Sequence, residues 1–188
     1  MPTTLLAALV LQSGPFAGAN WLTVPRSSSP VEQAKWIWVQ APGLPVPTAQ
    51  KAPVGRITLT KRWTLKERPV KADIWFTADN QSQVNLNGRL IGRSAMWEAI
   101  EQKDLTPFLK QGENLFEVEA VNGTGSADQN PGGFILAAQA QFGGGKSQVL
   151  LTDSSWQSPD GKAVVLGDYF TAPWNKAKSE VSPPVFAG

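Results

Sequence analysis

A regular alternation of apolar and polar side chains, ending in a two-residue turn signal, most constrains how this chain folds. In the stretch DIWFTADNQSQVNLNGRLIG at residues 73–92, apolar side chains recur at every second position, which is typical of β-strands. Asn87 and Gly88 interrupt the second run, and this dipeptide suits the two positive-φ positions of a type I′ turn. The stretch therefore predicts strands that lead into a tight hairpin.

The same period of two recurs along most of the chain. Residues 55–65 (GRITLTKRWTL) alternate apolar positions with threonine and basic residues, and residues 115–122 (LFEVEAVN) carry two glutamates on the face opposite their apolar residues. Further strands are predicted at residues 34–39, 134–142 and 148–152. Together these runs predict an all-β sandwich of about eight antiparallel strands with almost no helix.

Two tryptophans in the first predicted strand have two interpretations. Trp36 and Trp38 are expected on one side of the strand, with Ile37 on the other. Side by side, they could form a flat platform for a sugar ring. Burial of such large aromatic side chains contributes so much to stability that a place in the core is the favoured interpretation.

The connections have recognisable turn chemistry. Four prolines within residues 41–53 exclude a central strand there and predict a loop. The segment at residues 93–97 is expected to run over the surface. Asp104 is the predicted N-cap of a single helical turn over residues 104–110, and the Gly- and Asn-rich residues 123–133 predict a second long loop.

Composition excludes several classes of function. The 188 residues suit one domain with extensions, and 41% hydrophobic against 17% charged residues argues for a packed core. A formal net charge of only +2, with basic residues dispersed, predicts no binding to nucleic acid. The chain has no cysteine and no histidine, which excludes disulfides, thiolate chemistry and every catalytic arrangement that needs an imidazole base.

The first residues have the pattern of an export signal. An apolar run at residues 5–11 precedes Ala17-Gly18-Ala19, which suits a signal peptidase, so residues 1–19 are predicted to be a signal peptide and the protein to be secreted or periplasmic. An extra strand or a misassigned start codon are the alternatives, since no basic residue precedes the run. The run is too short to span a bilayer. Residues 20–33 are predicted to be a linker.

Several motifs, in their order along the chain, resemble the galactose-binding-like jelly-roll modules that accompany bacterial α-L-rhamnosidases and family 2 glycoside hydrolases. The motifs that carry the resemblance are AKWIW, TADNQSQVNLNGRLIG, DLTPFLKQGENLFEVEAVN, GGFILAAQ and LTDSSWQSP, with YFTAPWNKA at the end. The resemblance covers residues 34–175 and leaves residues 176–188 as a tail. It implies a jelly-roll β-sandwich that has no catalytic role of its own.

The resemblance also implies a ligand and its place. Modules of this kind bind at the loops of one end of the sandwich or on a concave sheet face, and an aromatic ring with amide and carboxylate groups suits a sugar. A glycan or polysaccharide is therefore the expected ligand, with Arg93, Trp97, Asp128 and Asn130 as the candidate binding residues. Trp97 has the alternative interpretation of closing the sandwich edge, and the loop that carries Asp128 and Asn130 that of a solvated connection.

Other functions have less support in the residues. A structural Ca²⁺ is common in related modules, but the sequence shows no D-x-D-x-D-G loop and no ligand set, so no cofactor is predicted. Glu117 and Glu119 lie about 6–7 Å apart on one strand face, yet such a pair is usually solvated, so no enzymatic activity is predicted. The alternative function is a structural or protein-interaction sandwich with a partner enzyme or surface protein.

Overall fold

The structure is a computed structural model that describes residues 29–126 and 128–174, and it is built almost entirely from β-strands. The predicted signal peptide and tail lie outside the described residues. The strands are β1 (Lys35–Gln40), β2 (Gly55–Leu65), β3 (Lys71–Asp79), β4 (Gln81–Leu86), β5 (Arg89–Ser94), β6 (Glu101–Asp104), β7 (Gly112–Asn122), β8 (Gly133–Gln141), β9 (Ser147–Leu151), β10 (Gln157–Ser158) and β11 (Gly161–Asp168). Three short 3₁₀ helices accompany them: η1 (Pro30–Gln33), η2 (Thr106–Phe108) and η3 (Gly143–Gly145).

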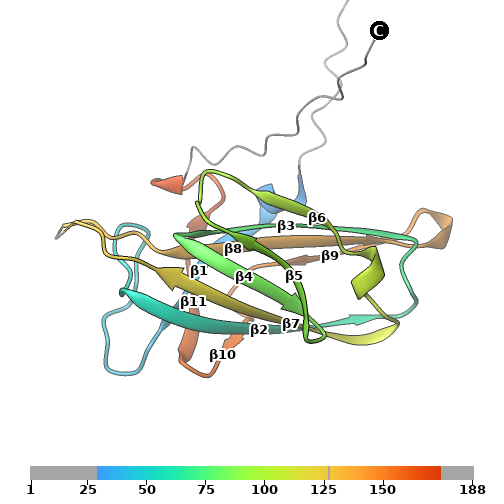
Figure 1. Ribbon diagram of the computed structural model, residues 1–188, viewed down its shortest axis with the longest axis horizontal. Coiled ribbons are helices and arrows are strands. Elements are labelled where there is room, and N and C mark those ends of the chain that lie inside the picture. The colour runs from blue at the N-terminus through green and yellow to red at the C-terminus, as the bar shows by residue number, and fades with distance from the viewer. Residues whose placement is uncertain (1–28, 127, 175–188) are drawn as a thin grey trace, which may run out of the picture.

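The strands form one antiparallel path that folds over into two layers. The order is β5-β4-β7-β2-β10-β11-β1-β8-β3-β6, with β9 paired to β8. Strands β5, β4, β7 and β2 form one layer, and β3, β8 and β9 lie behind them (Figure 1). The all-β sandwich is therefore confirmed, although the described residues form eleven strands where about eight were expected.

The main core lies between the two layers. Leu59 of β2, Leu86 of β4 and Phe116 of β7 contribute side chains from the first layer, and Phe76 of β3 and Phe134 of β8 from the second; all five are fully buried. Their alternation with outward residues on β2 and β7 follows the pattern in the sequence. This closely packed interior holds the end loops in place.

A second buried cluster covers the outer face of the β3–β8 layer. Ile135 of β8 and Trp75 of β3 point away from the main core into this cluster, so both strands are buried on both faces. Val31 of η1 is fully buried here, so the folded part extends into the predicted linker. Trp36 stacks on Trp174 with ring centroids 4.5 Å apart.

Both tryptophans of β1 are core residues, which confirms the interpretation favoured from the sequence. They belong to different clusters, however: Trp36 lies in the second cluster and Trp38 in the main core. The reason is a register shift in the β1–β11 pairing between Trp36 and Ile37, which interrupts the regular alternation of the strand, so that the two rings face different clusters. The two rings therefore do not form one platform.

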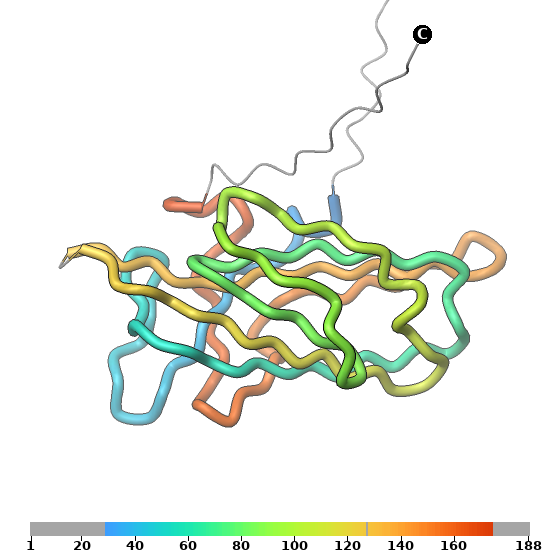
Figure 2. Tube along the Cα trace, in the orientation of Figure 1, coloured from blue at the N-terminus to red at the C-terminus, as the bar shows by residue number. Residues whose placement is uncertain are grey.

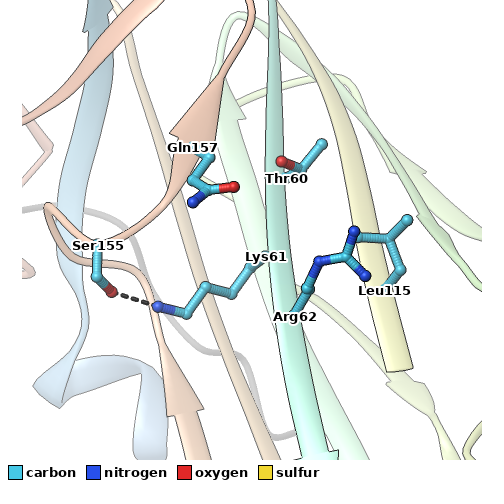
Figure 3. A pocket seen from close by; sticks show the side chains of 6 residues that line it. All are labelled: Thr60, Lys61, Arg62, Leu115, Ser155 and Gln157. Atoms are coloured by element: carbon cyan, nitrogen blue, oxygen red, sulfur yellow. Dashed lines mark hydrogen bonds between the residues drawn. The ribbon is translucent and has the colours of Figure 1, made fainter. Parts of the chain in front are cut away.

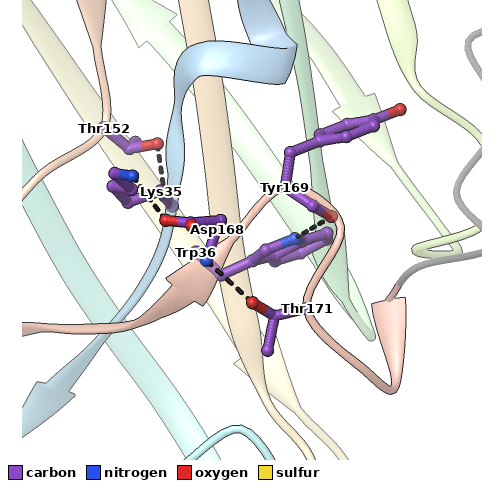
Figure 4. Close-up of polar contacts among 6 residues, drawn as sticks. All are labelled: Lys35, Trp36, Thr152, Asp168, Tyr169 and Thr171. Carbon is purple, nitrogen blue, oxygen red and sulfur yellow. Dashed lines mark hydrogen bonds and ion pairs between the residues drawn. The ribbon is translucent and has the colours of Figure 1, made fainter.

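The segment that follows β11 is tied to β1 by polar contacts (Figure 4). The indole N–H of Trp36 donates to the carbonyl of Tyr169 (3.3 Å), and Lys35 forms an ion pair with Asp168. Thr171 accepts the backbone N–H of Asp168 at 2.8 Å, which closes a short turn. These contacts hold the last described residues on the outer face.

Two local predictions need adjustment. Arg93 and Ser94 are the last residues of β5, and buried Ser94 shares a hydrogen bond with Ser82 (2.7 Å), so the surface segment begins only after them. The Asp104 carboxylate accepts the backbone N–H of Thr106 (2.9 Å), as a capping residue does, but the helical turn is shorter than expected and begins at Thr106.

Candidate functional site

The loops that follow β1, β5 and β7 lie toward the same end of the sandwich (Figure 2). This is the arrangement expected for a module that binds through its end loops. The three loops carry most of the residues predicted to bind a sugar. Their contacts show which of those residues are available.

Trp97, the predicted stacking residue, lies in the connection between β5 and β6. It is half-buried and packs against the second cluster. The carbonyl of its neighbour Met96 accepts a hydrogen bond from the Thr77 hydroxyl (2.8 Å), which ties this connection to β3. Arg93 is exposed on β5 in register with Gln83, and so projects from the outer face of the first layer.

The loop after β7 is anchored to the loop after β1 by Asn130. The Asn130 amide donates to the carbonyl of Ala52 (3.3 Å), and its backbone pairs with Gln50 and Ala52 at 3.0 and 2.8 Å. Asp128 is exposed. Within the described chain, no hydrogen bond joins Arg93, Trp97, Asp128 and Asn130 to one another, so each of the four stays a separate prediction.

A hollow of about 330 Å³ lies at this loop end, between the loop after β1, the start of β2 and the turn between β10 and β11; we call it the end hollow. Trp38 and Ile57 contribute buried apolar surface to its lining. Leu44 and Val54 are 48% and 58% exposed there. The hollow therefore presents carbon-rich surface to solvent at the end of the molecule.

Two charged side chains border the end hollow. Asp160 accepts the backbone N–H of Thr58 through Oδ2 (2.7 Å), while its Oδ1 has no hydrogen bond within the described chain. Arg56 forms an ion pair with Glu119 (2.6 Å). An apolar surface bordered by a carboxylate oxygen and a guanidinium can contact the C–H face of a sugar and its hydroxyls together.

A second hollow, of about 320 Å³, lies beside β2 and is more polar; we call it the side hollow. It is lined by Thr60, Lys61, Arg62, Leu115, Ser155 and Gln157. Figure 3 shows Lys61 reaching across to the Ser155 hydroxyl while Arg62 turns toward Leu115. Ser155 in turn donates to Asp153, so the Lys61 amine, this hydroxyl and this carboxylate form a chain of hydrogen bonds.

The two glutamates considered for acid–base chemistry are neighbours on β7. Glu117 is in register with Thr60 of β2, and Glu119 with Thr58. Neither glutamate lines the end hollow or the side hollow, and Glu119 is paired with Arg56. A carboxylate pair on a single strand face does not enclose a substrate as a pair of groups facing across a cleft does.

One buried carboxylate was not identified from the sequence. Asp79, at the end of β3, is 4% exposed and accepts the indole N–H of Trp174 at 3.0 Å. Burial raises the pKa of Asp79 above its usual value, the hydrogen bond from Trp174 lowers the pKa in part, and the nearby charge of Glu98 raises it. Its partner lies 95 residues away, a distance over which the sequence shows no signal.

The described residues show no group of three or more carboxylates that could hold a metal ion. They also include no helix with the length and apolar character needed to cross a membrane.

Sequence reasoning missed the residues of both hollows for a common reason. Asp160 and Val54 come from distant turns and loops, and Lys61 sits in a regular strand pattern. The signals available beforehand were the proline-rich loop over residues 41–53 and the turn residues at 158–161, which lie at one end only after folding.

Comparison with known proteins supports the fold. No family model matches the sequence, and no curated protein matches it either. Among solved structures, the α-L-rhamnosidase of Streptomyces avermitilis, complexed with L-rhamnose, has a TM-score of 0.66 and 20% identity over 77% of this chain and 15% of the enzyme. The α-L-rhamnosidase of Aspergillus terreus has a TM-score of 0.54 and 20% identity over 70% of this chain and 17% of the enzyme.

A fungal lectin is equally similar. The lectin of Pleurotus ostreatus, in complex with GalNAc, has a TM-score of 0.66 and 22% identity over 79% of this chain and 46% of the lectin. The chain thus spans less than half of each of these three proteins. At these identities the similarity shows a shared fold, which a part of these α-L-rhamnosidases and of this lectin have in common with the chain and which agrees with the expected β-sandwich.

Proposed function

We propose that this chain is a secreted, non-catalytic carbohydrate-binding module that holds part of a glycan in the end hollow. The observation that carries the proposal is the end hollow itself, in which apolar surface meets a free carboxylate oxygen at the loop end of the sandwich. The shared fold adds support, because one protein with this fold is a lectin solved with a bound sugar. The small share of each rhamnosidase that the chain matches supports a role without catalysis.

The chemistry of a pyranose fits the end hollow. One face of such a ring is largely C–H. Burial of this face against Leu44 and Val54 makes a favourable contribution to the binding free energy. Hydroxyls at the ring edge can donate to Asp160 Oδ1 and accept from Arg56. Because the contact area is small and open to water, binding is expected to be weak for a single sugar and stronger for an oligosaccharide.

A glycan array followed by titration calorimetry tests this proposal. Val54→Asp places an unpaired charge in the apolar wall and should weaken binding of the selected oligosaccharide about tenfold or more. Val70→Asp is the matched control, because Val70 is 69% exposed and does not line the end hollow. If the wild type binds no glycan and instead captures a partner enzyme or surface protein, the carbohydrate-binding proposal is wrong and the alternative of a protein-interaction sandwich is supported.

Secretion is tested separately. If residues 1–19 are a signal peptide, the protein exported by a bacterial host begins at Asn20, and mass spectrometry of the mature protein measures this directly. Retention of Met1 on an unexported protein would contradict it.

A further inference from the structure

Trp38 contributes an unpartnered indole N–H to the end hollow. Its side chain lines the hollow and is only 1% exposed, and within the described chain its N–H makes no hydrogen bond. The N–H of Trp63 also lacks a partner, but it is sealed inside the core, whereas that of Trp38 is not. Because a largely buried donor without an acceptor is unfavourable, a ligand oxygen that accepts this N–H would be stabilised.

Asp160 places a hydrogen-bond acceptor at the rim of the same hollow. Its Oδ2 accepts the backbone N–H of Thr58 (2.7 Å), and its own backbone N–H donates to the Ser158 hydroxyl (3.0 Å), so the carboxylate is held in position. Within the described chain, Oδ1 has no hydrogen bond and the carboxylate has no ion pair. Arg56, the other charged group at the rim, is paired with Glu119 at 2.6 Å. The rim therefore offers one fixed acceptor that carries a negative charge.

The turn that carries Asp160 lies directly against the strand that carries Trp38. Gly161 follows Asp160, and a Cβ at Gly161 would lie 2.1 Å from the carbonyl oxygen of Gln40 at the end of β1. Glycine allows this close approach, and its φ of 151° also suits glycine. From there β11 runs antiparallel to β1, with Val164 in register with Trp38. The donor and the acceptor therefore border one hollow from neighbouring strands.

The apolar wall, the donor and the acceptor together restrict which chemical group fits. Leu44, Pro53 and Val54 form the apolar wall. An ammonium group has no lone pair to accept the Trp38 N–H, and a carboxylate is repelled by Asp160. A hydroxyl can make both hydrogen bonds but brings no carbon to cover the wall. An acetamido group has a carbonyl oxygen, an N–H and a methyl group, and so matches all three features.

We propose that the end hollow selects a sugar that bears an N-acetyl group. The acetamido oxygen accepts the N–H of Trp38, its N–H donates to Oδ1 of Asp160, and its methyl group packs against Val54. This inference rests on the proposed function, because it assumes that a glycan binds in the end hollow, and it adds the substituent that the hollow recognises. The proposed function does not require it, since a glycan without an acetamido group could also occupy the hollow.

Titration calorimetry of the full chain with three β-1,4-linked trisaccharides tests this selectivity. Chitotriose, its fully deacetylated form and cellotriose differ only in the group at C2, which is acetamido, ammonium or hydroxyl. The wild type should bind chitotriose about tenfold or more tightly than either of the others. Equal affinity for chitotriose and cellotriose, or tighter binding of the deacetylated form, would overturn the inference.

Two conservative variants assign the preference to named atoms. Trp38→Phe keeps an aromatic ring in the core and removes the N–H. In Asp160→Asn the amide oxygen can still accept the Thr58 N–H, so that the NH₂ group replaces Oδ1 as the group without a partner. Each variant should lower the affinity for chitotriose about tenfold, to that of the wild type for cellotriose. Trp63→Phe is the matched control, because it removes an N–H that is sealed in the core and does not line the hollow.

The outcomes separate this inference from the proposed function. Thermal melts verify that each variant is folded, and Asp160→Asn tests the inference even if Trp38→Phe does not fold. Unchanged chitotriose binding in Asp160→Asn, or an equal loss in Trp63→Phe, overturns the inference, as does a wild type that binds none of the three trisaccharides. Binding of a glycan without an acetamido group that is weakened by Val54→Asp leaves the proposed function intact and shows that the N-acetyl selectivity is wrong.

Discussion

Asp79 connects the end of β3 to Trp174, the last described residue, through one buried hydrogen bond. Its carboxylate is 4% exposed and accepts the indole N–H of Trp174 at 3.0 Å, and Trp174 also stacks on Trp36. Burial makes the charged form costly, which is why the pKa of Asp79 is raised despite the hydrogen bond. The Asp79 carboxyl group thus holds Trp174 in position, and the folded state becomes less stable when this group ionises.

The effect of pH on this carboxyl group can be predicted in sign. Because its folded pKa lies above the ordinary value of 3.8, the native state binds the proton more tightly than the unfolded chain. The free energy of unfolding contributed by Asp79 is therefore largest below 3.8, falls as pH rises through the folded pKa, and is constant above it. Asp79→Asn keeps an acceptor and removes the titration, so its stability relative to wild type should rise with pH over that interval.

Urea denaturation at a series of pH values measures this difference. Asp79→Ala is the contrasting variant, because it leaves the Trp174 N–H without an acceptor and should cost about 1–3 kcal/mol. Parallel pH profiles for wild type and Asp79→Asn would contradict the prediction.

For single residues, the sequence predicted the kind of segment in which a residue lies more reliably than the partners that its side chain contacts. Asn130 was predicted in a loop of turn residues and lies in one, but its amide holds the loop to Ala52. Trp97 packs against the second cluster, in line with the alternative of an edge-closing residue. No sequence pattern could distinguish these roles, because each depends on what a different part of the chain brings alongside.

Among the elements, the β4–β5 hairpin was the most predictable. Asn87 and Gly88 have φ values of 52° and 76°, as a type I′ turn requires, which confirms the prediction from the dipeptide. The Asn87 side chain also accepts the backbone N–H of Leu115 (3.1 Å) and donates to Asn114 (3.0 Å). The turn therefore anchors the hairpin to the start of β7.

Gly88→Ala tests the backbone requirement of this turn. A Cβ at Gly88 meets no atom within 4 Å, so only the positive φ opposes the substitution, and the expected loss of stability is about 1 kcal/mol. Gly143→Ala is the matched control, since Gly143 also faces open space and has no positive φ. Denaturation midpoints should fall for the first variant and stay equal or rise for the second. Equal midpoints would contradict the turn argument.

Among the strands that the sequence did not predict, β6 and β10 depend on their neighbours for their form. Strand β6 (EQKD) is polar and largely exposed, and it is a strand because β3 pairs with it. Strand β10 has only two residues. By contrast, β2 was predicted with the bounds it has, because Ile57, Leu59, Trp63 and Leu65 are buried on one face of it and make the alternation recognisable.

At the scale of the whole molecule, the two ends of the described chain together cover the outer face of the second layer. Val31 from η1 and Trp174 from the last described residues belong with Ile135 to one buried cluster. Gly133 lies so close beneath Trp36 and Trp174 that a Cβ there would be 2.9 and 3.1 Å from their rings. The fold is therefore completed only when its last segment packs.

Trp174→Ala should destabilise the protein strongly. Removing a fully buried tryptophan that stacks on Trp36 and binds Asp79 is expected to cost about 3–5 kcal/mol. Phe170→Ala, at a side chain that is 63% exposed, should cost less than about 1 kcal/mol. Thermal unfolding measures both, and similar midpoints for the two variants would show that the last segment does not complete the fold.

The sequence alone determined the all-β class, the hairpin, the inward faces of β2 and β7 and the absence of imidazole and thiol chemistry. These depend on local conformational preference and on a period of two, which a single segment carries by itself. Only the tertiary structure decided where β10 stops short of β2, which charged groups border the two hollows, and that Asp79 meets Trp174. Such features arise from the packing of segments far apart in the chain, and no local pattern specifies which distant surface a side chain will meet.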